Sequence, residues 1–82
     1  MSQRGKLIAA LRNNQADCRL KDACKIARWI GFVEKKGKGS HRFFVKAGER
    51  TVLNFQDRGD GPVPVYQAKQ LLLMVDEFEE QA

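Results

Sequence analysis

The spacing of the apolar residues changes at Gly31, and this change constrains the fold more than any other feature of the sequence. Over residues 20–30 the apolar side chains recur every three or four positions, as they do on one face of an α-helix. Glycine is favoured where a helix ends. After Gly31 come three short segments rich in aromatic and β-branched residues, at 32–36, 40–46 and 50–55. Turns that contain glycine separate them, so we expect a three-stranded antiparallel meander.

Helical spacing returns at both ends of the chain. Residues 4–14 and residues 65–80 each place apolar side chains along one helical face, and a loop rich in Gly, Asp and Pro at 56–64 precedes the second of these. The 82 residues are enough for one small domain. We therefore predict an α+β fold in the order α-α-β-β-β-α, with the helices on one face of the sheet.

The charge of the chain is strongly positive and unevenly distributed. Formal net charge is +5 with a pI near 9.6, and between Lys35 and Arg50 six basic residues stand against the single acid Glu49. A basic stripe of this density is typical of a protein that binds a polyanion such as nucleic acid. The alternative is an ordinary solvated lysine surface.

His41 is the candidate catalytic residue. Histidine is the side chain type that exchanges a proton near neutral pH, and the only one in the chain follows a glycine-rich turn within the basic stripe. As a general base it would take the proton of a ribose 2′-OH, which then attacks the adjacent phosphorus without a metal ion. Lys36, Lys38 or Arg42 would neutralise the charge that develops on the phosphorus. The alternative is that His41 is an ordinary surface or cap residue at the start of a strand.

Alternation along 40–46 leaves the orientation of the strand open. It places His41 on one face with Phe43, and Arg42 on the other with Phe44. Each face therefore carries apolar side chains, and the pattern does not decide which face meets the helices. Phe43, Phe44 and Phe55 would suit a platform on which bases stack. In so short a chain we expect Phe43 and Phe55 to be needed in the core.

The sequence gives little support for a metal site or a cofactor. Cys18 and Cys24 are the only cysteines, and their spacing fits no familiar zinc pattern. We expect Cys24 to be a small buried hydrophobe and Cys18 to lie in a loop or helix cap. Asp57 and Asp60 do not have the spacing of a calcium loop, so a solvated turn is the favoured interpretation. We predict no cofactor and no metal.

The apolar segments are too short for a membrane span. The longest strongly apolar run, 71–75, is far below the roughly 20 residues that a membrane helix needs. The apolar stretch at 7–11 is also too short for a convincing signal peptide. We therefore expect a cytoplasmic protein that does not contact a membrane.

Three features taken together resemble the HicA family of toxins. They are a helix that ends in Ile30-Gly31-Phe32, the sequence Gly39-Ser40-His41 after the first expected strand, and a closing loop and helix at 55–72. The resemblance runs from residue 20 to about residue 80. It identifies 20–82 as a HicA-like domain, with a fold similar to the double-stranded-RNA-binding domain. Residues 1–19, with a helix of their own, form an N-terminal extension that small members of the family lack.

The resemblance implies the toxin of a type II toxin–antitoxin system. Such a toxin is an mRNA interferase, a metal-independent endoribonuclease that arrests translation. The family's catalytic histidine falls on His41. Its partners would be mRNA and a HicB-type antitoxin protein that covers the active site. The residues expected to contact RNA are Lys36, Lys38, Gly39, Ser40 and Arg42.

Two other functions remain open from the residues alone. Cleavage needs an acid as well as a base, and one histidine supplies only one of them. Lys38, Lys36, Tyr66 or water would have to be the acid. A non-catalytic RNA-binding module is therefore the first alternative. The second is a protein-interaction module whose basic face meets an acidic partner.

Overall fold

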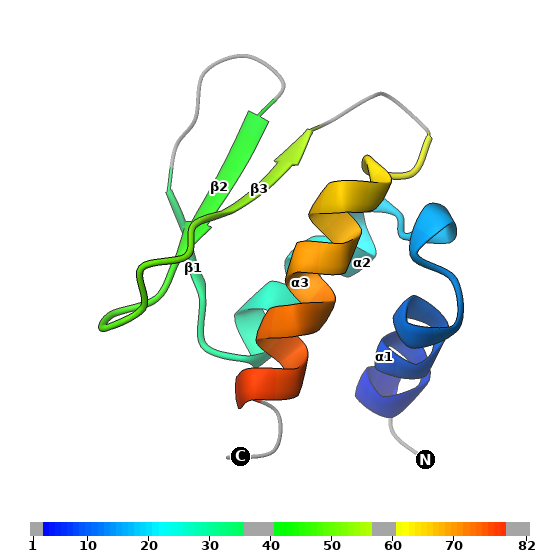
Figure 1. Cartoon of the computed structure of the whole chain (residues 1–82), viewed down its shortest axis with the longest axis horizontal. Helices are drawn as coiled ribbons and strands as arrows, with labels where there is room; N and C mark the ends of the chain where they lie inside the picture. The colour runs from blue at the N-terminus through cyan, green and yellow to red at the C-terminus, as the bar shows by residue number, and fades with distance from the viewer. Residues whose placement is uncertain (1–2, 36–40, 57–60, 79–82) are drawn as a thin grey trace.

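The change of spacing at Gly31 is the boundary between a helical part and a sheet. The structure is a computed structural model of the chain that describes residues 3–35, 41–56 and 61–78. Its elements are α1 (Gln3–Asn13), a short 3-10 helix η1 (Gln15–Asp17), α2 (Leu20–Trp29), β1 (Val33–Lys35), β2 (His41–Val45), β3 (Leu53–Gln56) and α3 (Val65–Phe78) (Figure 1). The predicted α+β class and the predicted element order are confirmed, with η1 as an addition.

The three strands form one antiparallel sheet in the order β1-β2-β3. In its register Glu34 pairs with Phe44, and Arg42 pairs with Phe55. The helices lie on one side of this sheet (Figure 1). The meander predicted from the glycine-containing turns is therefore present, with β2 in the centre.

The core lies between the sheet and the helices α2 and α3. Phe44 and Phe55, from adjacent strands, are fully buried there, and their ring centroids are 5.6 Å apart. Burying a phenylalanine side chain contributes about 1.5–3 kcal/mol. Leu71 and Val75 meet them from α3 and are also fully buried. No helix within the described residues is both long and apolar enough to cross a membrane.

The helix expected in the N-terminal extension is α1, and it shares this core. Its residues Ile8 and Leu11 are buried in the same hydrophobic cluster as the strand phenylalanines. Arg12 near the end of α1 donates to Asp76 of α3 at 2.7 Å. Residues 3–13 thus pack on α2 and α3 rather than standing apart from them.

The end of α2 shows why glycine is needed at position 31. The N–H of Gly31 bonds to the carbonyl of Arg28, and the N–H of Phe32 bonds to the carbonyl of Ala27. These two bonds form a Schellman motif, which requires a left-handed residue after the helix. Gly31 has a φ of +100°, as that motif demands. The predicted helix stop is confirmed.

The third strand begins three residues later than expected. A strand was predicted from Arg50, whereas β3 begins at Leu53. The carboxylate of Glu49 accepts a hydrogen bond from the backbone N–H of Thr51 at 2.8 Å. This local bond occupies a donor that a ladder would need, so the segment stays irregular.

Candidate functional site

The pleat of β2 decides which predicted site residues lie together. Phe44 is fully buried against the helices, so Arg42, two residues away, lies on the same helix-covered face. His41 and Phe43 lie on the opposite face, and in the part of the chain that the structure describes no helix covers it (Figure 1). We call this the uncovered face. The two faces that alternation left equivalent are therefore distinguished by the burial of Phe44.

The imidazole of His41 is held by Asn54 of the neighbouring strand. Nδ1 of His41 lies 3.3 Å from Oδ1 of Asn54. His41 pairs with Gln56 and Phe43 pairs with Asn54, so the two side chains are diagonal neighbours on one face. A carbonyl oxygen only accepts hydrogen bonds, so a neutral imidazole that bonds to it through Nδ1 has its proton on Nδ1. Nε2 therefore keeps its lone pair and has the electronic form of a base.

The ring of Phe43 lies beside the imidazole. Its centroid is 6.2 Å from that of His41, and the two planes differ by 20°. Phe43 is only half-buried. In the register its partners are Lys35 on β1 and Asn54 on β3. An aromatic ring thus lies in the middle of the uncovered face, between a cation and an amide.

The uncovered face carries no acidic side chain from the strands. The three strands contain one carboxylate, that of Glu34, and it lies on the helix-covered face with Phe44. Lys35 on the uncovered face is exposed. In a chain of net charge +5, an anion that approaches this face is attracted by the protein and meets no strand carboxylate.

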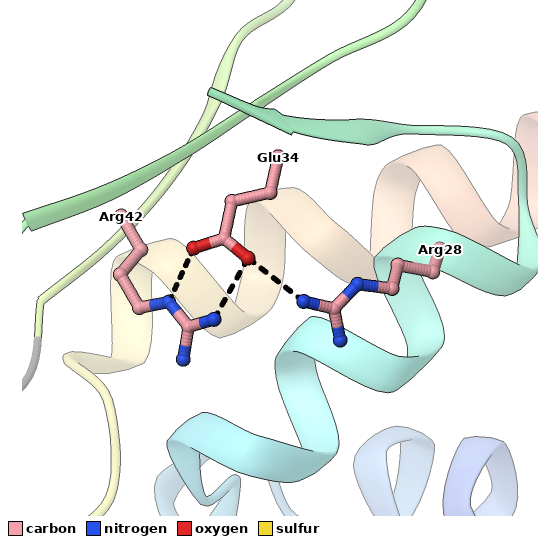
Figure 2. Close-up of polar contacts among 3 residues, drawn as sticks. All are labelled: Arg28, Glu34 and Arg42. Carbon is pink, nitrogen blue, oxygen red and sulfur yellow. Dashed lines mark hydrogen bonds and ion pairs between the residues drawn. The ribbon is translucent and has the colours of Figure 1, made fainter. Parts of the chain in front are cut away.

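Arg42 lies on the other face, in an ion-pair network (Figure 2). Its Nε and Nη2 donate to the two carboxylate oxygens of Glu34 at 2.7 and 2.8 Å, and Nη2 of Arg28 donates to the same carboxylate at 2.7 Å. The hydrogen bonds from Arg42 are the main reason that the pKa of Glu34 is lowered from its usual value. The structure therefore does not bring Arg42 together with His41, although the two are adjacent in sequence.

The other predicted RNA-contacting residues cannot be placed beside His41. Lys36, Lys38, Gly39 and Ser40 lie outside the described residues. Tyr66, named as an alternative acid, lies at the start of α3, and its hydroxyl accepts a hydrogen bond from Gln67 at 3.2 Å.

The aromatic residues divide between core and surface. Phe55 and Phe44 are core residues, and for Phe55 this is as expected. Phe43 was expected in the core with Phe55, and that prediction is wrong, because Phe43 lies on the opposite side of the sheet. The reason is the pleat, which sends adjacent side chains to opposite faces.

The cysteines have the character of buried apolar residues. Both are free and buried, as expected for Cys24, and Cys18 caps the end of η1. Burial raises the pKa of the Cys18 thiol to about 11 and also raises that of Cys24. Among the residues with described positions, no three His, Cys, Asp or Glu side chains gather where they would hold a metal ion. Asp57 and Asp60, for which a solvated turn was the favoured interpretation, lie outside those positions.

Asn54 and Lys35 are the site residues that sequence reasoning missed. Leu53 and Phe55 are apolar and alternate with Asn54 and Gln56, which was a sign that both amides face away from the core. That sign does not say which residue of β2 lies opposite. Only the register places Asn54 within reach of His41.

Comparison with known proteins adds no relative. No protein-family model, no curated protein and no solved structure matches the chain.

Proposed function

We propose that this chain is a metal-independent endoribonuclease that cleaves mRNA, with His41 as its general base. One observation carries the proposal: Nδ1 of His41 is bound to Oδ1 of Asn54 on an uncovered face without strand carboxylates. This contact suits the neutral tautomer with its proton on Nδ1, in which Nε2 is the atom that accepts a proton.

The chemistry proceeds by attack of the RNA on itself. Nε2 takes the proton of a ribose 2′-OH, and the oxygen attacks the adjacent phosphorus. The bond from phosphorus to the 5′-oxygen breaks, which leaves a 2′,3′-cyclic phosphate, and the 5′-oxygen takes a proton from water to become a 5′-hydroxyl. Lys35 is the described cation on this face, and it is suited to neutralise the charge on the phosphorus. Lys36, Lys38, Gly39 and Ser40 are proposed as further RNA contacts.

Arg42 receives a structural role in this proposal. Its bidentate pair with Glu34 joins β2 to β1 on the helix-covered face. Because a paired guanidinium on that face is not directed at an RNA held beside His41, we assign the phosphate contacts to the lysines. Arg42 then supports the strand that positions His41.

The fold is compatible with the resemblance to HicA toxins. The order α2-β1-β2-β3-α3, with helices on one face of a three-stranded antiparallel sheet, is the layout expected of a domain similar to the double-stranded-RNA-binding domain. We therefore propose that the chain is the toxin of a type II toxin–antitoxin pair and that it acts in the cytoplasm. Its protein partner would be a HicB-type antitoxin that covers His41.

Expression in a bacterial host tests the catalytic role. Wild type should arrest growth and deplete mRNA, and His41→Ala should do neither. Leu73→Ala is the control, because it truncates an exposed side chain of α3 and leaves the strands and the imidazole in place. Purified wild type should cleave RNA in the presence of a chelator and leave 2′,3′-cyclic phosphate ends.

Two results would decide against this function. Equal RNA decay with wild type and His41→Ala would show that His41 is not the base. Tight, salt-dependent RNA binding without any cleavage product would instead assign the chain to the non-catalytic RNA-binding modules. The partner is tested separately: a small open reading frame beside this gene, when co-expressed, should restore growth and co-purify with the toxin.

A further inference from the structure

We infer that the uncovered face is a binding site for an unpaired nucleobase, which stacks on Phe43 beside His41. This rests on the proposed function, since it specifies the RNA that the site takes as single-stranded. The inference starts from a ring that the core does not use. Phe44 and Phe55 are fully buried under the helices, whereas Phe43 stays half-buried on the other side of the sheet.

The side chains of the uncovered face are arranged in successive rows across the strands. In order along β2, the rows are His41 with Gln56, then Lys35 with Phe43 and Asn54, then Val33 with Val45. Val33 is 58% exposed. The face thus has two polar side chains at one end, two valines at the other, and between them a row in which Phe43 lies between Lys35 and Asn54.

A nucleotide likewise has an apolar part and a charged part. Its base is flat and apolar on both surfaces, and its phosphate is charged. A base that lies on Phe43 and extends toward the valine row leaves its phosphate at the His41 end, with Lys35 beside the ring. That is the end at which the proposed chemistry needs the phosphorus. The absence of strand carboxylates on this face removes the main repulsion against such a ligand.

The stacking requirement favours unpaired RNA over a duplex. Within a duplex the surfaces of a base are covered by its stacked neighbours, so proteins read double-stranded RNA through its shape, phosphates and 2′-hydroxyls. An aromatic ring contributes nothing to that contact. It contributes strongly when a single-stranded base lies on it, and it does so with little preference for sequence. The ring at position 43 therefore indicates a single-stranded substrate.

Binding measurements on uncleavable RNA test the inference. The probe is a labelled single-stranded RNA of about 12 nucleotides with every ribose 2′-O-methylated, so that no nucleophile is present. The same strand in a perfect duplex is the second probe. Phe43→Leu keeps an apolar side chain but removes the ring, and Phe43→Tyr keeps the ring. Leu73→Ala is the control, because Leu73 is an exposed side chain of α3 outside the uncovered face.

We expect Phe43→Leu to weaken single-strand binding by about 5- to 150-fold, the loss typical of one stacked base. Phe43→Tyr and Leu73→Ala should stay near wild type, and duplex binding should be weak and insensitive to position 43. Equal single-strand affinity of Phe43→Leu and wild type would overturn the inference. So would a concentration-dependent dimer that Phe43→Leu abolishes, since the face would then belong to a second copy of the chain.

The outcomes separate this inference from the proposed function. If cleavage depends on His41 but binding ignores position 43, the stacking site is refuted and the nuclease stands. If single strands bind through Phe43 and are never cleaved, the nuclease is refuted and the stacking site stands. Thermal unfolding of each variant shows whether its fold is intact before either conclusion is drawn.

Discussion

Asn54→Ala should slow RNA cleavage without weakening RNA binding. The substitution removes the oxygen that accepts the proton of Nδ1 and leaves the imidazole in place. A net hydrogen bond contributes about 0.5–1.5 kcal/mol, and a length of 3.3 Å is at the long end of the normal range. We therefore take about 0.5–1 kcal/mol, which lowers the population of the competent tautomer by about 2- to 5-fold.

The measurement is a pH–rate profile of single-turnover cleavage. Asn54→Ala should lower the plateau rate by that factor and leave KM unchanged. Asn54→Asp keeps an acceptor and adds a negative charge, which favours the protonated imidazole. The acidic limb of its profile should therefore move to higher pH. A purely structural role for Asn54 would not move this limb.

Two results would refute this reasoning. One is an Asn54→Ala variant that cleaves at the wild-type rate, and the other is an Asn54→Asp variant whose profile does not move. Gln56→Ala is the matched control, since it removes the other amide of the uncovered face and leaves the contact between Asn54 and His41 intact. An equal loss in Gln56→Ala would show a general effect on β3 rather than control of the tautomer.

Two further predictions concern stability. Glu34→Ala should lower the free energy of unfolding by about 1–2 kcal/mol, because the hydrogen bonds from Arg42 are lost while both side chains stay about one-third exposed. The pKa of Glu34 is lowered in the folded state, so this contribution is present above the ordinary carboxylate pKa of about 4.3 and is lost as the pH falls through the folded value. Urea unfolding of Glu34→Gln should therefore show a stability that depends less on acid pH than that of wild type. An unchanged dependence on pH would contradict this prediction. Gly31→Ala should lower the thermal stability more than Gly48→Ala. Both glycines have positive φ, but only at Gly31 would the new Cβ meet Nζ of Lys46, which donates to a carbonyl at the end of the helix. Equal losses of stability would show that backbone strain is the whole effect.

The secondary structure was largely predictable because it depends on local spacing. The apolar period of 20–30 required one buried face, and α2 buries Ala23, Cys24 and Ala27 as that period demands. Gly31 ended the helix through its own backbone conformation. The start of β3 was missed because a hydrogen bond from the N–H of Thr51 to the Glu49 side chain competes with strand pairing. The alternation of apolar and polar residues gives no sign of such a bond.

The candidate site was predictable only in part. His41 was identified because it is the only histidine in the sequence and because the basic residues near it are close to it along the chain. Its partner Asn54 lies 13 residues away, on another strand. No local pattern relates the two residues, because the register depends on where the loop after Val45 lets β3 begin.

Sequence by itself determined the elements, their order and the basic character of the chain, because propensity, spacing and charge are local quantities. The tertiary structure decided which face of β2 is covered. Both faces carry apolar residues, and the choice was made when Phe44 packed with Phe55 beneath the helices. That packing turned Arg42 toward Glu34 and left His41 and Phe43 uncovered. Adjacent residues of a strand must face opposite ways, so a single buried ring fixed the placement of all the others.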